Sequence, residues 1–86
     1  MPSNMVGQMI RQHEEFIGAI YAVAGSRPFT MAEIRRHGVE EPKGCTIQKL
    51  RARGVVMLAQ RLPRERRVWR LSQQVAEHFE AQEVSA

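Results

Sequence analysis

The 86-residue chain has no aspartate, one cysteine, and no apolar run near the length of a membrane span. A span needs about 20 apolar residues, so we expect no membrane partner. Cys45 alone cannot form an intramolecular disulfide, which fits a reducing compartment. The first residues, MPSNMVGQMI, lack the basic segment and apolar stretch of a secretory signal. The expected location is therefore the cytoplasm, with the nucleoid as the natural site for a basic protein.

Motifs for catalysis and metal binding are also missing. No nucleophile elbow, phosphate loop or pair of catalytic carboxylates occurs in the sequence. His13, His37, His78 and Cys45 fall on four different predicted elements, without the spacing of metal ligands. We expect no catalytic residue, no metal and no cofactor, and therefore no enzyme. His13 lies on an apolar helix face and is interpreted as a buried or half-buried structural histidine.

Anions are almost absent from residues 43–70. Nine cations and one anion, Glu65, give this segment a charge of +8, so a net charge of +4 leaves −4 for the remainder. This distribution is typical of a protein that presents one face to a polyanion. A solvated basic surface is the ordinary alternative. The length is that of one domain, residues 1–86, with a single small core.

Apolar residues recur at three- and four-residue steps from Asn4 to Ala24, which predicts a long amphipathic first helix. Ser3 or Asn4 can cap its start, and Gly25 can end it in a left-handed conformation. No internal repeat or linker follows.

The segment PFTMAEIRRHG carries the signals of a second, short helix over residues 31–37. Thr30 and Glu33 have the spacing of a capping box, and Phe29 can pack on Ile34 as a hydrophobic staple. Gly38 is expected to end this helix, with Val39 as the apolar anchor of the connection.

A third helix is predicted over residues 42–53, because Pro42 is tolerated in a first helical turn and Gly54 can terminate the helix. Helical projection places Ile47 and Leu50 on its inner face. Four residues are expected to project outward: Gly44, Cys45, Gln48 and Ala52.

Residues 55–71 are predicted to form a β-hairpin, with strands 55–60 and 67–71 and a turn at 62–65 that Pro63 stiffens. The hairpin carries five arginines: Arg61, Arg64, Arg66, Arg67 and Arg70. Trp69 shares a strand face with Leu71, which favours a core position over a base-stacking role. Ser72 can cap a last helix over residues 73–82.

This order of elements, with TMAEIRRHGVEEPKGCTIQKLRARGVV and RRVWRLS, resembles the winged helix-turn-helix transcription regulators. The first string is similar to their second and third helices and the second string to the return strand of their wing. The resemblance covers about residues 16–79 and concerns residue classes. It implies an α+β, mostly helical fold with a three-helix core, a β-hairpin wing and a C-terminal helix.

The resemblance implies that helix 42–53 is a recognition helix, which can enter a major groove roughly 12 Å wide. Gln48 can pair with adenine through its amide, while Lys49 and Arg51 can reach guanine or phosphate. The full expected surface on this helix is Lys43, Gly44, Cys45, Thr46, Gln48, Lys49, Arg51 and Ala52. The arginines of the hairpin are expected on phosphates or in a minor groove. For each position, an ordinary exposed residue is the alternative.

The predicted function is sequence-specific binding of double-stranded DNA by a transcription regulator, a repressor or an activator. Two alternatives stay open: an adaptor that binds an acidic protein partner, and a sequence-indifferent protein that coats or silences DNA. A homodimer is expected because operators are commonly symmetric. Its surface is predicted at Met5, Met9, Val75 and Phe79, unless these residues pack inside. Glu40 and Glu41 are expected to be structural, at a helix start.

Overall fold

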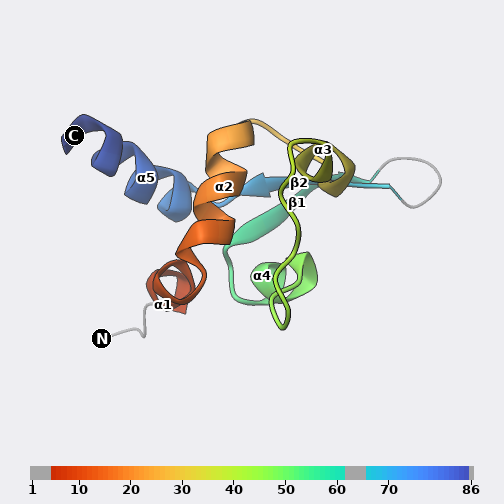
Figure 1. Ribbon diagram of the computed structural model, residues 1–86, viewed down its shortest axis with the longest axis horizontal. Helices are drawn as coiled ribbons and strands as arrows, with labels where there is room; N and C mark the ends of the chain where they lie inside the picture. The colour runs from red at the N-terminus through yellow and green to blue at the C-terminus, as the bar shows by residue number, and fades with distance from the viewer. Residues whose placement is uncertain (1–4, 62–65, 86) are drawn as a thin grey trace.

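The computed structural model describes residues 5–61 and 66–85, with side chains described as far as Gln82. These residues form five helices and a two-stranded antiparallel hairpin (Figure 1). The elements are α1 (Met5–Gln12), α2 (Glu14–Ala24), α3 (Met31–Arg36), α4 (Ile47–Ala52), β1 (Val56–Arg61), β2 (Arg67–Leu71) and α5 (Gln73–Ser85). The expected α+β, mostly helical class is confirmed. No helix among the described residues is long and apolar enough to cross a membrane.

The predicted helix over residues 4–24 is wrong as a single element, because it is interrupted at His13. This residue has φ −130° and ψ 39°, outside the helical region, and it separates α1 from α2. A straight helix of about 20 residues would be about 30 Å long. The molecule measures 39 × 29 × 24 Å, and the interruption lets both α1 and α2 pack against α5. His13 is half-buried, as expected.

The start of α3 confirms the Thr30 half of the predicted capping box. The hydroxyl of Thr30 accepts a hydrogen bond from the backbone N–H of Glu33 at 3.2 Å, and Phe29 and Ile34 are both buried. The helix ends at Arg36, one residue before the predicted end, and Gly38 follows with φ 82°. A side chain at this φ would be strained, which explains glycine at the turn.

The third predicted helix, α4 in the structure, starts later in the chain than expected. Helix α4 begins at Ile47, five residues after Pro42, and residues 42–46 form a loop. Gly44 adopts φ 84°, which a right-handed helix does not accommodate. Cys45, predicted to project outward, is fully buried. Thr46 is the N-cap, and its hydroxyl accepts a hydrogen bond from the backbone N–H of Lys49 at 3.2 Å.

The hairpin follows the predicted strands closely. Val56 pairs with Leu71 and Leu58 with Trp69, and a bulge between Leu58 and Gln60 precedes the pairing of Arg61 with Arg67. Trp69 is only 2% exposed, which confirms its predicted core position. The predicted turn with Pro63 and Arg64 lies outside the described residues.

A backbone bridge from outside the hairpin extends this small sheet. Phe29, just before α3, donates its N–H to the carbonyl of Trp69 at 2.8 Å and accepts from the N–H of Trp69 at 2.7 Å. Strand β2 therefore lies between β1 and Phe29. The bridge ties the start of α3 to the hairpin.

Helix α5 extends to Ser85, beyond the predicted end at residue 82. The hydroxyl oxygen of Ser72 is buried and has no hydrogen-bond partner, so the predicted side-chain cap is not formed. Phe79 is buried and its ring stacks on Tyr21 with centroids 5.3 Å apart.

The burial of the terminal helices corrects the expected dimer surface. Met9, Val75 and Phe79 are at most 8% exposed and belong to the core of this chain. Met5, at 38%, is the one member of the predicted set that is exposed. The alternative, that these residues pack inside, holds for three of the four.

Candidate nucleic-acid interface

Helix α4 presents a polar outer face and an apolar inner face. Gln48 and Ala52 are exposed, as predicted, whereas Ile47 and Leu50 are buried. The preceding loop exposes Lys43 and Gly44, but it buries Cys45. Burial raises the pKa of the Cys45 thiol, and the nearby Lys49 ammonium opposes this effect only in part. Cys45 is therefore a neutral core residue and cannot contact DNA.

The two cations of α4 predicted to reach bases both make contacts within the chain. The ammonium of Lys49 donates a hydrogen bond to the carbonyl of Gly44 at 3.2 Å. The guanidinium of Arg51 lies over the ring of Trp69, 6.0 Å from its centroid. A cation at this distance from an aromatic face is attracted to it. Arg51 therefore links α4 to the hairpin, and Gln48 is left as the freely exposed amide on the helix.

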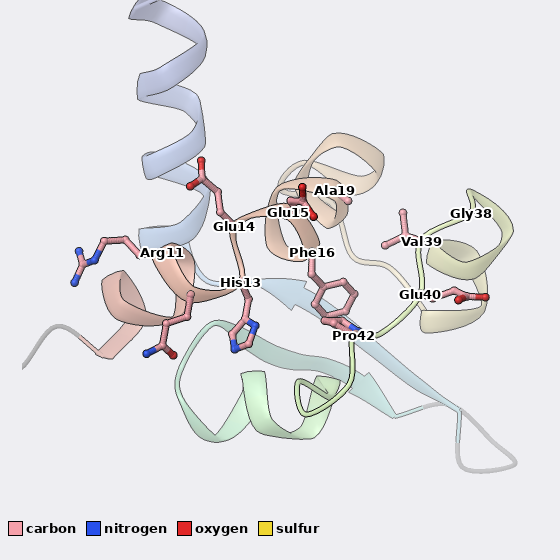
Figure 2. A pocket seen from close by; sticks show the side chains of 11 residues that line it. Arg11, His13, Glu14, Glu15, Phe16, Ala19, Gly38, Val39, Glu40 and Pro42 are labelled. Atoms are coloured by element: carbon pink, nitrogen blue, oxygen red, sulfur yellow. The ribbon is translucent and has the colours of Figure 1, made fainter.

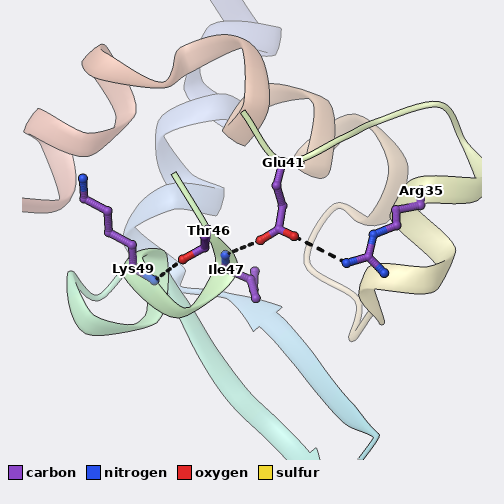
Figure 3. Close-up of polar contacts among 5 residues, drawn as sticks. All are labelled: Arg35, Glu41, Thr46, Ile47 and Lys49. Carbon is purple, nitrogen blue, oxygen red and sulfur yellow. Dashed lines mark hydrogen bonds and ion pairs between the residues drawn. The ribbon is translucent and has the colours of Figure 1, made fainter. Parts of the chain in front are cut away.

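The start of α4 is fixed by a carboxylate from the preceding loop (Figure 3). One carboxylate oxygen of Glu41 accepts a hydrogen bond from the backbone N–H of Ile47 at 2.8 Å. The other oxygen lies 3.4 Å from the Arg35 guanidinium on α3. The structural role expected for Glu41 is confirmed. Glu40, the residue before it, is exposed and forms neither of these contacts.

The arginines of the hairpin lie on different faces of its strands. Arg61 is directly opposite Arg67, on the strand face that Trp69 and Leu71 also occupy. Arg70 pairs with Met57 on the other face, so Arg67 and Arg70 point to opposite faces of the hairpin. Like charges directly opposite each other destabilise a hairpin. An anion bound between Arg61 and Arg67 would relieve this repulsion.

An open groove of about 690 Å³ joins the start of α3, the exposed side of α4 and the distal part of β2. Its lining residues are Thr30, Met31, Ala32, Arg36, Ile47, Gln48, Arg66, Arg67 and Trp69. The structure thus brings together Gln48, Arg66 and Arg67, which the sequence had placed on two separate elements. We call this feature the arginine groove.

Several predicted site residues lie elsewhere. Lys43, Arg61 and Arg70 are exposed but do not line the arginine groove, and Arg64 is outside the described residues. Sequence reasoning missed Arg36, which lines the groove from α3. The sequence signal for it was the adjacent pair of cations, Arg35 and Arg36. In the structure Arg35 pairs with Glu41, and Arg36 lines the groove.

The described residues contain no group of histidine, cysteine or glutamate side chains that could hold a metal ion. Comparisons with protein-family models, with curated protein sequences and with solved structures found no match to this chain.

Proposed function

We propose that this chain is a winged-helix protein that binds double-stranded DNA and regulates transcription, with α4 in the major groove and the hairpin on the adjacent backbone or minor groove. The arginine groove carries the proposal. It brings an exposed amide, Gln48, into one groove with two arginines of the hairpin and one of α3. An amide that pairs with a base edge and cations that neutralise phosphates are the two components that duplex recognition needs.

The connectivity supports the same architecture. Helices α3 and α4 are joined by a turn, and the bridge from Phe29 to Trp69 adds a short strand beside β2. Three helices, a turn and a small sheet with a protruding hairpin are the parts of a winged helix. In Figure 1 the hairpin extends away from α1, α2 and α5. A protruding cationic hairpin is suited to follow a DNA backbone beside the helix.

A second candidate, sequence-indifferent binding to DNA, is favoured by one specific observation. Of the side chains on α4 that reach far enough for base contacts, Lys49 and Arg51 already make contacts within the chain. If these contacts persist on DNA, binding is dominated by phosphates, and such binding carries little sequence information. The two candidates differ in whether Gln48 selects a base.

Selection from a randomised duplex library at near-physiological salt tests both candidates. A sequence-specific regulator enriches a short site, and Gln48→Ala then changes the preference at one base position. Ala52→Ser, a small change on the same exposed face, serves as the matched control and is expected to keep the preference. Retention without enrichment supports the sequence-indifferent candidate. Failure to retain any duplex would contradict both.

Intrinsic fluorescence gives an independent readout of where DNA binds. Trp69 is the one tryptophan of the chain and is among the residues that line the arginine groove. We expect duplex DNA to change the emission of Trp69 in a saturable way. Arg66→Ala with Arg67→Ala should shift the titration to higher DNA concentration, because two phosphate contacts are removed.

A further inference from the structure

The cleft between the α1–α2 junction and the loop after α3, of about 570 Å³, differs in charge from the arginine groove (Figure 2). The charged residues in its lining are Arg11, Glu14, Glu15 and Glu40. Among the described residues that line the arginine groove, by contrast, Arg36, Arg66 and Arg67 are cations and none carries a carboxylate. An anionic ligand is therefore expected on the side of the molecule that carries the hairpin.

The hairpin contains a bulge that decides which face Arg61 occupies. The strand pairs on either side of it are Leu58 with Trp69, Gln60 with Val68, and Arg61 with Arg67. Ala59 is therefore one residue in excess on β1. In a strand without a bulge, side chains alternate between the two faces, and Arg61 would lie on the face opposite to Leu58. The bulge instead brings Arg61 onto the face of Arg67, directly across from it.

This register is unfavourable for the hairpin by itself. Side chains directly opposite each other have Cβ atoms about 4.5–5.5 Å apart, and like charges at this distance repel. Without the extra Ala59, the uncharged Gln60 would lie across from Arg67. Both Arg61 and Arg67 are exposed, and neither forms an ion pair with a carboxylate of the described residues. Protection of the strand edge explains a bulge, but it does not explain two opposed arginines.

We infer that Arg61 and Arg67 form a clamp for a single phosphate group, and that the bulge at Ala59 holds this phosphate clamp in register. A guanidinium presents its N–H groups as a planar fork that matches two oxygens of a phosphate. Two opposed forks bind different oxygens of the same phosphate, and its negative charge removes the repulsion between them. Arg67 also lines the arginine groove, so the phosphate clamp lies at the edge of that groove. The assignment of the phosphate to a DNA backbone rests on the proposed function, because a free phosphate or a phosphate ester has the same chemistry.

Titration of the DNA-free chain with inorganic phosphate tests the phosphate clamp directly. NMR signals of the arginine Nε–H groups report each guanidinium separately, with sodium chloride at equal ionic strength as the control. We expect phosphate to shift the signals of Arg61 and Arg67 with one common, saturable dependence on concentration. Arg61→Ala should weaken the response of Arg67 at least about tenfold, because one of two charge-assisted contacts is lost. Arg70→Ala removes a cation from the other face of β2 and should leave the response unchanged.

An exchange of two neighbouring residues separates geometry from charge. Gln60→Arg with Arg61→Gln keeps the composition and the net charge, but it moves the guanidinium to the face of Val68. It should weaken the response of Arg67 to phosphate as much as Arg61→Ala does. Equal affinity of the parent chain and the exchanged variant, or a response of Arg67 that Arg61→Ala does not alter, overturns the inference. Circular dichroism verifies that each variant is folded.

Salt-dependent titration with duplex DNA shows whether DNA supplies the phosphate. Because loss of either arginine opens the clamp, Arg61→Ala, Arg67→Ala and their combination should each make the slope of log affinity against log salt less negative by about 0.9. A change of about 1.8 for the combination would mean two separate phosphate contacts and would overturn the clamp. If inorganic phosphate binds but the parent chain retains no duplex, the proposed function fails and the clamp stands as a site for a free phosphate or ester. If the parent chain binds duplex but the phosphate titration shows no clamp, only this inference fails.

Discussion

The thiol of Cys45 is fully buried in the core, just before the start of α4. Burial raises its pKa above the ordinary value of 9.0. At pH 7.5 we expect it to react with a thiol reagent at least about tenfold more slowly in the native chain than in urea. Because the native pKa is raised, stability is unaffected well below pH 9 and falls above it, where the unfolded chain loses the proton first. Equal rates in both states would contradict the prediction.

Arg51 was predicted to reach guanine or phosphate, but its guanidinium lies over the ring of Trp69. Arg51→Ala should uncover the indole, shift its emission to longer wavelength and lower the free energy of unfolding by about 0.5–1 kcal/mol. The readouts are fluorescence and urea denaturation. Arg53→Ala removes an equally exposed cation two residues away that makes no such ring contact, and it should change neither. An unchanged spectrum for Arg51→Ala would rule out the contact.

At the scale of elements, α4 is a six-residue helix that depends on its caps. Backbone N–H groups of its first turn donate hydrogen bonds to the Thr46 hydroxyl and the Glu41 carboxylate. Glu41→Ala removes a charge-assisted bond to Ile47 and the pair with Arg35, so we expect a loss of about 1–2 kcal/mol in the free energy of unfolding. Urea denaturation followed by circular dichroism measures this.

The neighbouring Glu40 supplies a matched control for this prediction. Glu40→Ala removes an equal charge from an exposed side chain without the bond to Ile47, and it should change stability by less than about 0.5 kcal/mol. Glu41→Gln keeps an acceptor for the N–H and should lose less than Glu41→Ala. If Glu40→Ala and Glu41→Ala were equally destabilising, general charge and not the cap would be responsible.

Elements with local signals could be predicted from the sequence, and elements set by tertiary contacts could not. The cap at Thr30 and the strands around Trp69 depend on neighbouring residues and were predicted closely. The late start of α4 depends on Glu41, six residues before Ile47 in sequence, and on the burial of Cys45. The interruption at His13 accompanies the packing of both α1 and α2 against α5, which lies far away in the sequence. The spacing of apolar residues along the chain predicts neither the late start of α4 nor the interruption at His13.

The residues of the candidate site also fall into those that the sequence predicts and those that only tertiary contacts bring together. The exposed Gln48 and the cationic hairpin follow from residue types and spacing. The arginine groove also contains Arg36, and it requires α3, α4 and β2 to be adjacent, which the bridge between Phe29 and Trp69 helps to fix. The sequence therefore predicted the chemistry of the surface but not its full set of residues.

At the scale of the whole molecule, charge should dominate the affinity for DNA. Each phosphate neutralised contributes about −0.9 to the slope of log affinity against log salt, so about four to six contacts give a slope of about −4 to −5. Arg66→Ala with Arg67→Ala should make the slope less negative by about 2 for every duplex tested. Arg11→Ala removes a cation of α1 that does not line the arginine groove, and it should leave the slope unchanged. Fluorescence titrations over a range of salt measure both. Equal slopes for the groove variant and the parent chain would mean that the arginine groove does not contact the phosphates.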